Sequence, residues 1–507
     1  MNKKIIAAFL VSAGLMSGCT KLEEELRDNV TYDDAVAITN VDALLKACYD
    51  GMHLPYQDQA GMFALSDHTT DDAAGPTRAG DWDDNGVWRV LHSHQWNADH
   101  AYITNTFNNL LTVVYNTTNV LNFKPTAKQE GEARFLRAFV MFDVLDCWNQ
   151  VPVRDPGESL LNPPKVLTGT AALDFIIAEA NKALTQLDPA NPAGKANVDA
   201  CKMLLMKCYL NKGVIANRKT PTFAAADMQQ VITLADQIIS SGKYNFTTGS
   251  YFDNFAPTNG SISKENIFTF QRTPGTAYGA GNSVRSRWFM TLHYNQNPSG
   301  WNGFVSLSDF YDKFEASDKR RGGDYAGVTD VSGLKVGFLV GQQFNEAGVA
   351  LKDRTGAPLA FTRDFKLKET GANLEVTGIR VIKYPPDYKS GDNVDNDYVY
   401  YRYADVWLMK AEALWRTGQA GQALTMVNQL RAARGATALA SLTNDNFCDE
   451  RGREFYWESN RRTDLIRFGK YLQAYQEKPA STEERLIFPI PNTALAVNPN
   501  LKQNPGY

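Results

Sequence analysis

Tryptophans alternate with polar side chains in one short stretch, GPTRAGDWDDNGVWRVLHSHQWNADH, residues 75–100. The rings are Trp82, Trp88 and Trp96. A pyranose ring has a face of C–H groups that packs on such aromatic surfaces, and its hydroxyls need amide, carboxylate or guanidinium partners. The stretch therefore predicts a sugar-binding surface. Its polar candidates, led by the first three, are Arg78, Asp83, Asn97, Asp81, Asn85 and Arg89.

A second stretch has the same character: RTPGTAYGAGNSVRSRWFMTLHYNQNPSGWNGF, residues 272–304. We expect Tyr278, Trp288 and Trp301 to add aromatic surface to the same site. For any single ring, core packing and ligand stacking are equally compatible with the sequence. Additional candidates are Arg287, Tyr294 and Asn297.

Two groups of residues raise the alternative of a metal site. The first group contains His92, His94, His100, Asp67, Asp71 and Asp72. A His-x-His pair beside carboxylates could hold a transition metal, but loop histidines need no metal. The second is DNVDND (392–397), which has the oxygen ligands that calcium prefers but lacks the EF-hand spacing. We favour a solvated loop there, with structural calcium as the alternative, and we expect no other cofactor.

Enzymatic chemistry finds little support in the motifs. The patterns H-E-x-x-H, G-x-S-x-G and the P-loop are absent. A glycosidase needs two carboxylates that face one bond, and a sequence cannot show such a pair. We therefore expect no catalytic residues, and keep a metal-dependent hydrolase or a glycosidase as less favoured alternatives.

Helices must position these candidates, because helical periodicity dominates both ends of the chain. In residues 402–418, apolar side chains recur at steps of three and four. Gly418 breaks this run, and a second apolar stripe follows it up to Gly435. Such a helix pair with small residues at its turn resembles a tetratricopeptide unit. Further helices are expected at 101–121, 129–148, 171–187, 196–212 and 227–240.

Two regions interrupt the helical pattern, residues 62–99 and 242–397. In the second, Gly, Asn, Tyr, Phe and Pro are frequent, and LKVGFLVGQQF and LEVTGIRVIKY predict short strands. Long loop-rich insertions are usually functional, so we expect them to bind the ligand. The whole predicts a mainly α protein with a large irregular half. The helical scaffold would occupy about 41–61, 100–241 and 398–470, followed by a C-terminal tail, 471–507, in one domain from 41 to 507.

The N-terminus predicts export and lipidation. Lys3 and Lys4 precede about a dozen apolar or small residues, fewer than the roughly 20 that span a bilayer. The run ends in LMSGC, which resembles the lipobox of bacterial lipoproteins. We expect residues 1–18 to be a signal peptide, Cys19 to carry acyl chains such as palmitate, and residues 19–40 to form a tether. A plain secretory signal is the alternative.

Charge and cysteine content argue against two further classes of protein, those that bind nucleic acid and those held together by disulfides. The chain has 507 residues and a net charge of −4, so no basic field suggests nucleic acid. Of its six cysteines, five remain after Cys19. Each lies in an apolar helical context, so we interpret them as small core residues rather than disulfide partners. They are Cys48, Cys147, Cys201, Cys208 and Cys448.

Four stretches together strongly resemble the SusD/RagB family of surface lipoproteins. They are EARFLRAFVMFDVLDCWNQVPV (132–153), RYADVWLMKAEALWRTG (402–418), ERGREFYWESNRRTDLIRFG (450–469) and IFPIPNTALAVNPNLKQNPGY (487–507). Their charged side chains are best explained as ion pairs that join helices. The resemblance implies about four tetratricopeptide-like helix pairs that carry an irregular, ligand-binding half.

The resemblance also implies a function. It predicts a protein without enzymatic activity that captures oligosaccharide or polysaccharide at the cell surface. The protein would be held on the outer membrane by its lipid anchor, and would deliver the glycan to a TonB-dependent transporter of the SusC type. A surface receptor for peptides or another nutrient is the alternative. The acidic run after Cys19 resembles a signal for export to the cell surface.

We predict that Cys19→Ala leaves the protein without a lipid and removes it from the outer-membrane fraction. The reason is that two or more acyl chains anchor a protein almost permanently, since each buried methylene contributes about 0.8 kcal/mol. Membrane fractionation and metabolic labelling with a palmitate analogue measure this. A variant that still fractionates as a lipid-modified membrane protein would refute the lipobox interpretation.

Overall fold

The computed structural model describes residues 38–246, 249–272, 279 and 281–507. Cys19 and Tyr278 lie outside this part of the chain. Residues 41–507 form one compact unit. Across the described ranges, no helix combines the length and the apolar character needed to cross a membrane.

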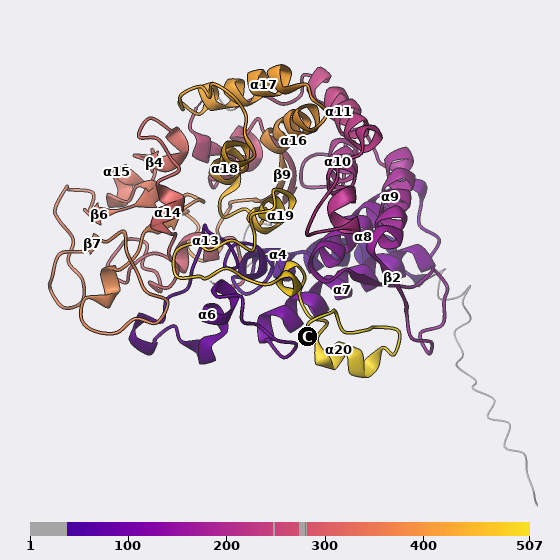
Figure 1. Ribbon diagram of the computed structural model, residues 1–507, viewed down its shortest axis with the longest axis horizontal. Helices are drawn as coiled ribbons and strands as arrows, with labels where there is room; N and C mark the ends of the chain where they lie inside the picture. The colour runs from indigo at the N-terminus through magenta and orange to yellow at the C-terminus, as the bar shows by residue number, and fades with distance from the viewer. Residues whose placement is uncertain (1–37, 247–248, 273–278, 280) are drawn as a thin grey trace, which may run out of the picture. The chain divides into compact units, whose positions relative to one another are not determined.

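Within the described residues, eight helices pack each on the next and form the scaffold (Figure 1). Taken in order they make four pairs, so the predicted mainly α fold with about four helix pairs is confirmed. The helices are α3 (Val41–Gly51), α7 (Ala101–Asn122), α8 (Ala127–Trp148), α9 (Gly169–Gln186), α10 (Val198–Ala216), α11 (Ala225–Ser240), α16 (Tyr403–Arg416) and α17 (Ala420–Ala433).

Local signals in the sequence set the limits of these helices. A capping box begins α8, in which the Thr126 hydroxyl accepts from the Gln129 backbone and the Gln129 side chain accepts from the Thr126 N–H. Asn149, in the left-handed conformation with φ 60°, ends the same helix. Because α8 packs against both α7 and α9, it is buried on nearly all sides along its second half.

Most of the short elements of the long insertion gather on the side of this unit away from α8, α9 and α10 (Figure 1). The predicted strands are present: β5 (Val336–Leu339) pairs antiparallel with β8 (Arg380–Ile382), with Phe338 opposite Val381. Residues 62–99 contain short helices that we did not predict, α5 (Met62–Ser66) and α6 (Val87–His92).

Several other short elements complete this half and the connections. The helices are α4 (His53–Gln57), α12 (Asn259–Ile262), α13 (Ser286–Phe289), α14 (Ser308–Tyr311) and α15 (Thr329–Ser332). The strands are β1 (Gln150–Val153), β2 (Lys165–Thr168), β3 (Asn266–Phe270), β4 (Gly322–Gly323), β6 (Gly341–Gln342), β7 (Ala360–Phe361) and β9 (Tyr398–Arg402). Strands β1 and β2, β3 and β9, β4 and β5, and β6 and β7 pair antiparallel. Single 3-10 turns lie at Arg78–Gly80, Asp84–Gly86, Tyr251–Phe255, Lys319–Arg321, Leu374–Val376 and Glu483–Leu486.

The chain after the scaffold folds back across it. Helices α18 (Asn444–Phe455) and α19 (Arg461–Arg467) are followed by a largely irregular tail that contains α20 (Asn492–Val497). The Phe488 N–H donates to the Cys147 carbonyl at 2.8 Å, and the Asn504 side chain donates to the Trp148 carbonyl at 2.9 Å. The tail is therefore bonded to the end of α8.

A buried cluster of charges, which we call the Glu454 cluster, joins the two halves. It consists of Glu265, Arg320, Arg402, Arg434 and Glu454, all with side chains at most 1% exposed. Glu454 accepts from Arg402 at 2.6 Å, Arg434 at 2.7 Å and Arg320 at 2.9 Å. Glu265 accepts from Arg434 at 2.8 Å. Glu265 and Arg320 belong to the loop-rich half. The scaffold side contributes Arg402, Arg434 and Glu454.

The charged side chains of the third motif form the ion pairs that we predicted. Arg451 bridges Asp405 and Asp464 at 2.9 and 2.8 Å, and so joins α18 to α16 and α19. Further pairs are Arg461 with Asp71, Arg462 with Asp146, and Arg467 with Glu412. The five cysteines Cys48, Cys147, Cys201, Cys208 and Cys448 are buried free thiols, which confirms their place in the core.

We predict that Glu454→Gln lowers the free energy of unfolding by about 3–5 kcal/mol, because removal of one partner leaves buried guanidinium groups uncompensated. Denaturant titration measures this. The matched control is Glu483→Gln, since Glu483 is 57% exposed and pairs with Lys219 at the surface. It should change stability by less than about 1 kcal/mol. Equal losses for both variants would contradict the role of the cluster.

Low pH should also lower the stability of the region around the Glu454 cluster, where Glu450 pairs with Arg320. Burial alone would raise the pKa of Glu450, but Arg320, Arg453 and Arg431 outweigh it and lower that pKa from 4.5 to about 2. A lowered folded-state pKa contributes stability that is complete above the unfolded value and is lost as pH falls. The contribution of Glu450 should therefore disappear between about pH 4.5 and pH 2.

Candidate functional site

Four of the five predicted tryptophans are buried, and three of them have no free face for a ligand. Trp88 is fully buried, Trp96 is 2% exposed and Trp288 is 1% exposed. The Trp88 indole N–H donates to Asp84 Oδ2 at 2.9 Å, and the Trp96 indole N–H donates to the Tyr507 hydroxyl at 2.8 Å. We therefore correct the assignment of these three rings: they pack in the core.

The other predicted residues are divided between the surface and the interior. Asn97 is exposed, and its Oδ1 accepts from the backbone N–H of Asp99 at 3.0 Å. Asp83 pairs with Arg89 at 2.5 Å. Arg78 is buried, and Tyr278 lies outside the described residues. The residues that the structure brings together are Arg78, Trp82 and Trp301.

Trp82 and Trp301 form the aromatic part of a surface groove. Trp301 is 45% exposed, whereas Trp82 is 7% exposed. Their ring centroids lie 6.4 Å apart, and the Trp82 indole N–H donates to the Trp301 carbonyl at 2.9 Å. A Cβ on Gly303 would lie 2.4 Å from the Trp82 ring, so only glycine at this position lets the indole lie against the backbone. Trp82 thus holds Trp301 at the surface.

The groove consists of two adjoining pockets. The aromatic pocket has a volume of about 410 Å³ and is lined by Gln59, Asp81, Trp82, Asp84, Tyr294 and Trp301. The polar pocket has a volume of about 230 Å³, and its lining includes Arg78, Asp81, Tyr294, Asn302, Arg354, Asn373 and Glu375. Asp81 and Tyr294 belong to both linings and lie between the two. The volumes suit a site for a small molecule or a short segment of a polymer.

Arg78 joins the loops that form the polar pocket through hydrogen bonds to their backbone carbonyls. Its Nε donates to the Asn302 carbonyl at 2.8 Å, and its Nη1 donates to the carbonyls of Leu374 and Thr377 at 3.0 Å. Nη1 also lies 3.3 Å from Glu369. Burial lowers the pKa of Arg78 to about 10, so the group stays charged at neutral pH. One guanidinium therefore joins three segments that are far apart in the sequence.

A second set of contacts shapes the wall of the polar pocket. Arg354 lies over the Tyr294 ring, 3.9 Å from its centroid, and pairs with Glu375 at 2.5 Å. His293 lies 2.9 Å from the other oxygen of Glu375, and its Nδ1 accepts from the Asn295 N–H at 3.0 Å. The proton of the neutral ring is thus on Nε2, which donates to Glu375. Burial lowers the pKa of His293, which keeps the ring neutral.

Some of these residues could not be identified from the sequence alone. Arg354 and Glu375 lie in the long insertion with no aromatic residue adjacent to either in sequence, and Gln59 lies in a turn two residues after the end of α4. Tyr294 and Asp81 were secondary candidates. Only the tertiary fold brings these segments together, so no pattern of local spacing could have identified the whole set.

The histidines of the suggested metal group contact backbone carbonyls of the protein, so one ring nitrogen of each already has a partner. His92 Nε2 contacts the Gln476 carbonyl at 3.0 Å, His94 Nε2 the Thr69 carbonyl at 2.8 Å, and His100 Nε2 the Val87 carbonyl at 3.1 Å. Asp71 pairs with Arg461 at 2.6 Å. In the described ranges, no three His, Cys, Asp or Glu side chains gather as a metal site would require.

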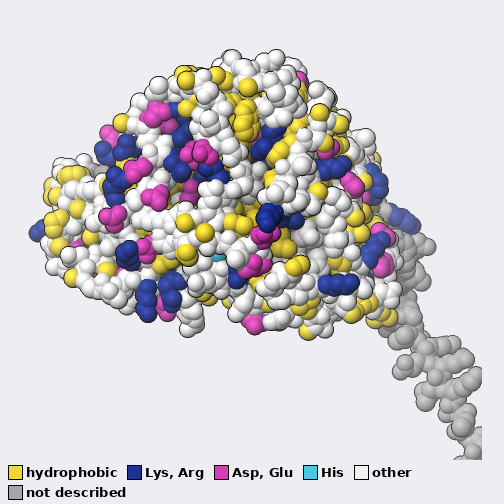
Figure 2. All heavy atoms as spheres, in the orientation of Figure 1, with side chains coloured by type: hydrophobic (Ala, Val, Ile, Leu, Met, Phe, Trp, Pro, Cys, Tyr) yellow, Lys and Arg dark blue, Asp and Glu magenta, His cyan; other side chains and the backbone are white. Residues whose placement is uncertain are grey.

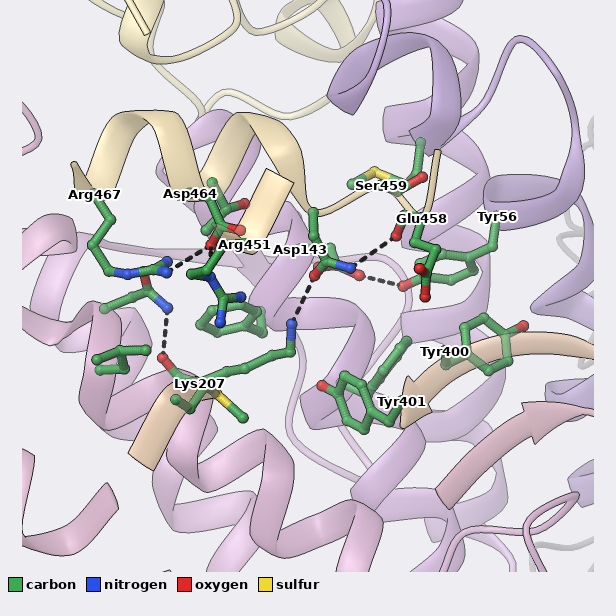
Figure 3. Close-up of a pocket in the computed structure, with 18 of the residues that line it drawn as sticks. Tyr56, Asp143, Lys207, Tyr400, Tyr401, Arg451, Glu458, Ser459, Asp464 and Arg467 are labelled. Atoms are coloured by element: carbon green, nitrogen blue, oxygen red, sulfur yellow. Dashed lines mark hydrogen bonds and ion pairs between the residues drawn. The ribbon is translucent and has the colours of Figure 1, made fainter. Parts of the chain in front are cut away.

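A third pocket lies inside the scaffold, between α8, α10, α18 and α19 (Figure 3). Figure 3 shows Tyr56 directed at Asp143, with the hydroxyl donating to Oδ2 at 2.6 Å, and Arg467 directed at Asp464 at 2.6 Å. Burial raises the pKa of Asp143 to about 7. The volume of about 70 Å³ has room for roughly two water molecules, too little for a sugar ring. This pocket is therefore not the ligand site.

Comparison with known proteins shows what the chain resembles. A model described as the SusD family matches residues 250–507. SusD-like protein P38 of Formosa agariphila is 24% identical over 545 residues, which cover 100% of this chain and 99% of the relative. The starch-binding protein SusD of Bacteroides thetaiotaomicron is 25% identical over 421 residues, 75% of this chain and 73% of the relative.

Solved structures share the fold. A SusD superfamily protein from Parabacteroides distasonis has a TM-score of 0.70 at 18% identity, covering 92% of this chain and 98% of its own. Surface glycan-binding protein A from Bacteroides thetaiotaomicron, solved in complex with laminarihexaose, has a TM-score of 0.64 at 19% identity, with the same coverage. At these identities the likeness establishes the architecture alone.

Proposed function

The chain belongs to the SusD family, and from that premise we propose that it captures a glycan at the cell surface and delivers it to a TonB-dependent outer-membrane transporter. The proposal combines three parts: a glycan-binding groove, a lipid anchor at Cys19, and a partner that forms the pore. The relatives named above support the first part, because one is a starch-binding protein and another binds laminarihexaose.

The observation that carries the proposal is the aromatic wall of the groove. Trp301 keeps 45% of its surface exposed, although a large ring gains free energy by burial. It lies beside pockets that contain carboxylate, amide and guanidinium groups. An exposed indole with such neighbours offers a stacking surface for a sugar face together with partners for its hydroxyls.

The polar groups of the groove support binding rather than cleavage. The Glu375 carboxylate accepts hydrogen bonds from His293 and Arg354. Burial alone would raise the pKa of Glu375, but these hydrogen bonds outweigh burial and lower it. A general acid for glycoside hydrolysis needs the opposite shift, a raised pKa that keeps a proton available at neutral pH. Glu375 is thus suited to fix the pocket wall, and we propose that the bound glycan leaves uncut.

We predict that Trp301→Ala weakens the binding of the glycan by about 30-fold, equivalent to about 2 kcal/mol for a central aromatic contact. Isothermal titration with a panel of oligosaccharides, and with peptides as the alternative ligands, measures this. Tyr115→Ala is the matched control, since Tyr115 is 47% exposed on α7, a scaffold helix. It should bind as the wild type does.

Three results would contradict this proposal. Wild-type affinity in Trp301→Ala would place the site elsewhere. Binding of peptides but of no glycan would favour the alternative receptor. New reducing ends after long incubation with the bound glycan would favour a glycosidase.

We predict that the protein, at native expression and in mild detergent, co-purifies with a large outer-membrane barrel. A glycan captured at the surface can cross the outer membrane only if another protein forms a pore. The family implies that this protein is a transporter of the SusC type. A seal between the two should bury more than the roughly 1,600 Å² of a standard interface, so the complex should survive purification. Recovery of this chain alone from cells grown on the inducing glycan would contradict the partner.

A further inference from the structure

Carboxylates outnumber cations along the groove. The carboxylates are Asp81, Asp84, Asp353 and Glu375, and the cations are Arg78 and Arg354. Among the described residues, the lining of the aromatic pocket contains both Asp81 and Asp84 but no Lys or Arg. Asp81 also lines the polar pocket, so a ligand that spans both pockets has to pass this carboxylate.

The two cations are already neutralised by the protein. Arg78 is buried, lies 3.3 Å from Glu369, and uses its other N–H groups on backbone carbonyls. Arg354 is half exposed, but its Nε donates to Glu375 at 2.5 Å and its guanidinium stacks on Tyr294. An anionic ligand would therefore have to share Arg354 with Glu375 to gain a counter-charge.

The carboxylates of the aromatic pocket, in contrast, keep acceptor capacity. Asp84 accepts one hydrogen bond, from the Trp88 indole at 2.9 Å. In the described part of the chain, neither Asp81 nor Asp84 forms an ion pair, and both are exposed.

We propose that the groove selects uncharged glycans and rejects chains that carry uronate or sulfate groups, with Asp81 as the main selecting residue. The inference rests on the proposed function and narrows it to a substrate class. Free carboxylates accept strong hydrogen bonds from neutral sugar hydroxyls. The same carboxylates repel an anionic substituent at both pockets. Among the described lining residues, Arg354 is the one exposed cation, and it is already paired with Glu375.

The first experiment is a binding panel at low ionic strength. The neutral members are laminarin, malto-, xylo- and manno-oligosaccharides, and the anionic members are oligogalacturonate, alginate and chemically sulfated laminarin. We expect binding to at least one neutral member, and affinities for every anionic member that are at least about tenfold weaker. Preferred binding of an anionic glycan would overturn the inference and leave the proposed function intact. Binding to neither class would instead count against the proposed function.

The second experiment changes the selecting charge. Asp81→Asn keeps the size and one acceptor oxygen, so neutral binding should fall by no more than a few-fold. Binding of the anionic members should rise by about threefold or more, and the gain should shrink in high salt, where surface charges are screened. Asp174→Asn on α9 is the matched control, since Asp174 is 64% exposed on the scaffold. If Asp81→Asn leaves the ratio of anionic to neutral binding as it is in the control, Asp81 does not select.

Discussion

The Glu454 cluster is the constraint on which the rest of the structure depends. Glu265 and Arg320 come from the loop-rich half, and Arg402, Arg434 and Glu454 come from the scaffold side. Charges buried without partners cost several kcal/mol each, so the cluster is stable only when all of its segments are in place. The irregular half is therefore bonded to the helices through its most buried charges. The two halves should consequently lose their structure together.

The same principle operates on a smaller scale at the groove. Arg78 donates to the carbonyls of Asn302 and Leu374, which belong to separate segments, and Glu375 joins His293 to Arg354. These bonds hold the pocket walls before any ligand arrives, which limits the entropy that binding would cost. Trp82 extends the arrangement to Trp301 by packing on Gly303. An irregular chain thus gains a fixed shape from a few buried polar side chains.

The sequence predicted the scaffold well and the site only in outline. Helices such as α16 and α17 follow from apolar periodicity and from Gly418, because these signals are local. The burial of a loop tryptophan is decided by distant partners: Trp96 is covered by Phe488 and bonded to Tyr507, some 400 residues later. For the same reason all three rings of the stretch 75–100 are buried, and of the three it is Trp82 that lines the groove. Arg354 and Glu375 become recognisable only in three dimensions.

The five buried thiols have a practical consequence. Burial raises the pKa of Cys48 and Cys448 to about 12, and the other three shift further in the same direction. At neutral pH they carry almost no thiolate, the form that attacks alkylating reagents. A single cysteine introduced at the rim of the groove would therefore be the one reactive thiol among the described residues. A fluorophore or spin label could be attached there without prior removal of the five buried cysteines, which makes the surroundings of the groove accessible to spectroscopy.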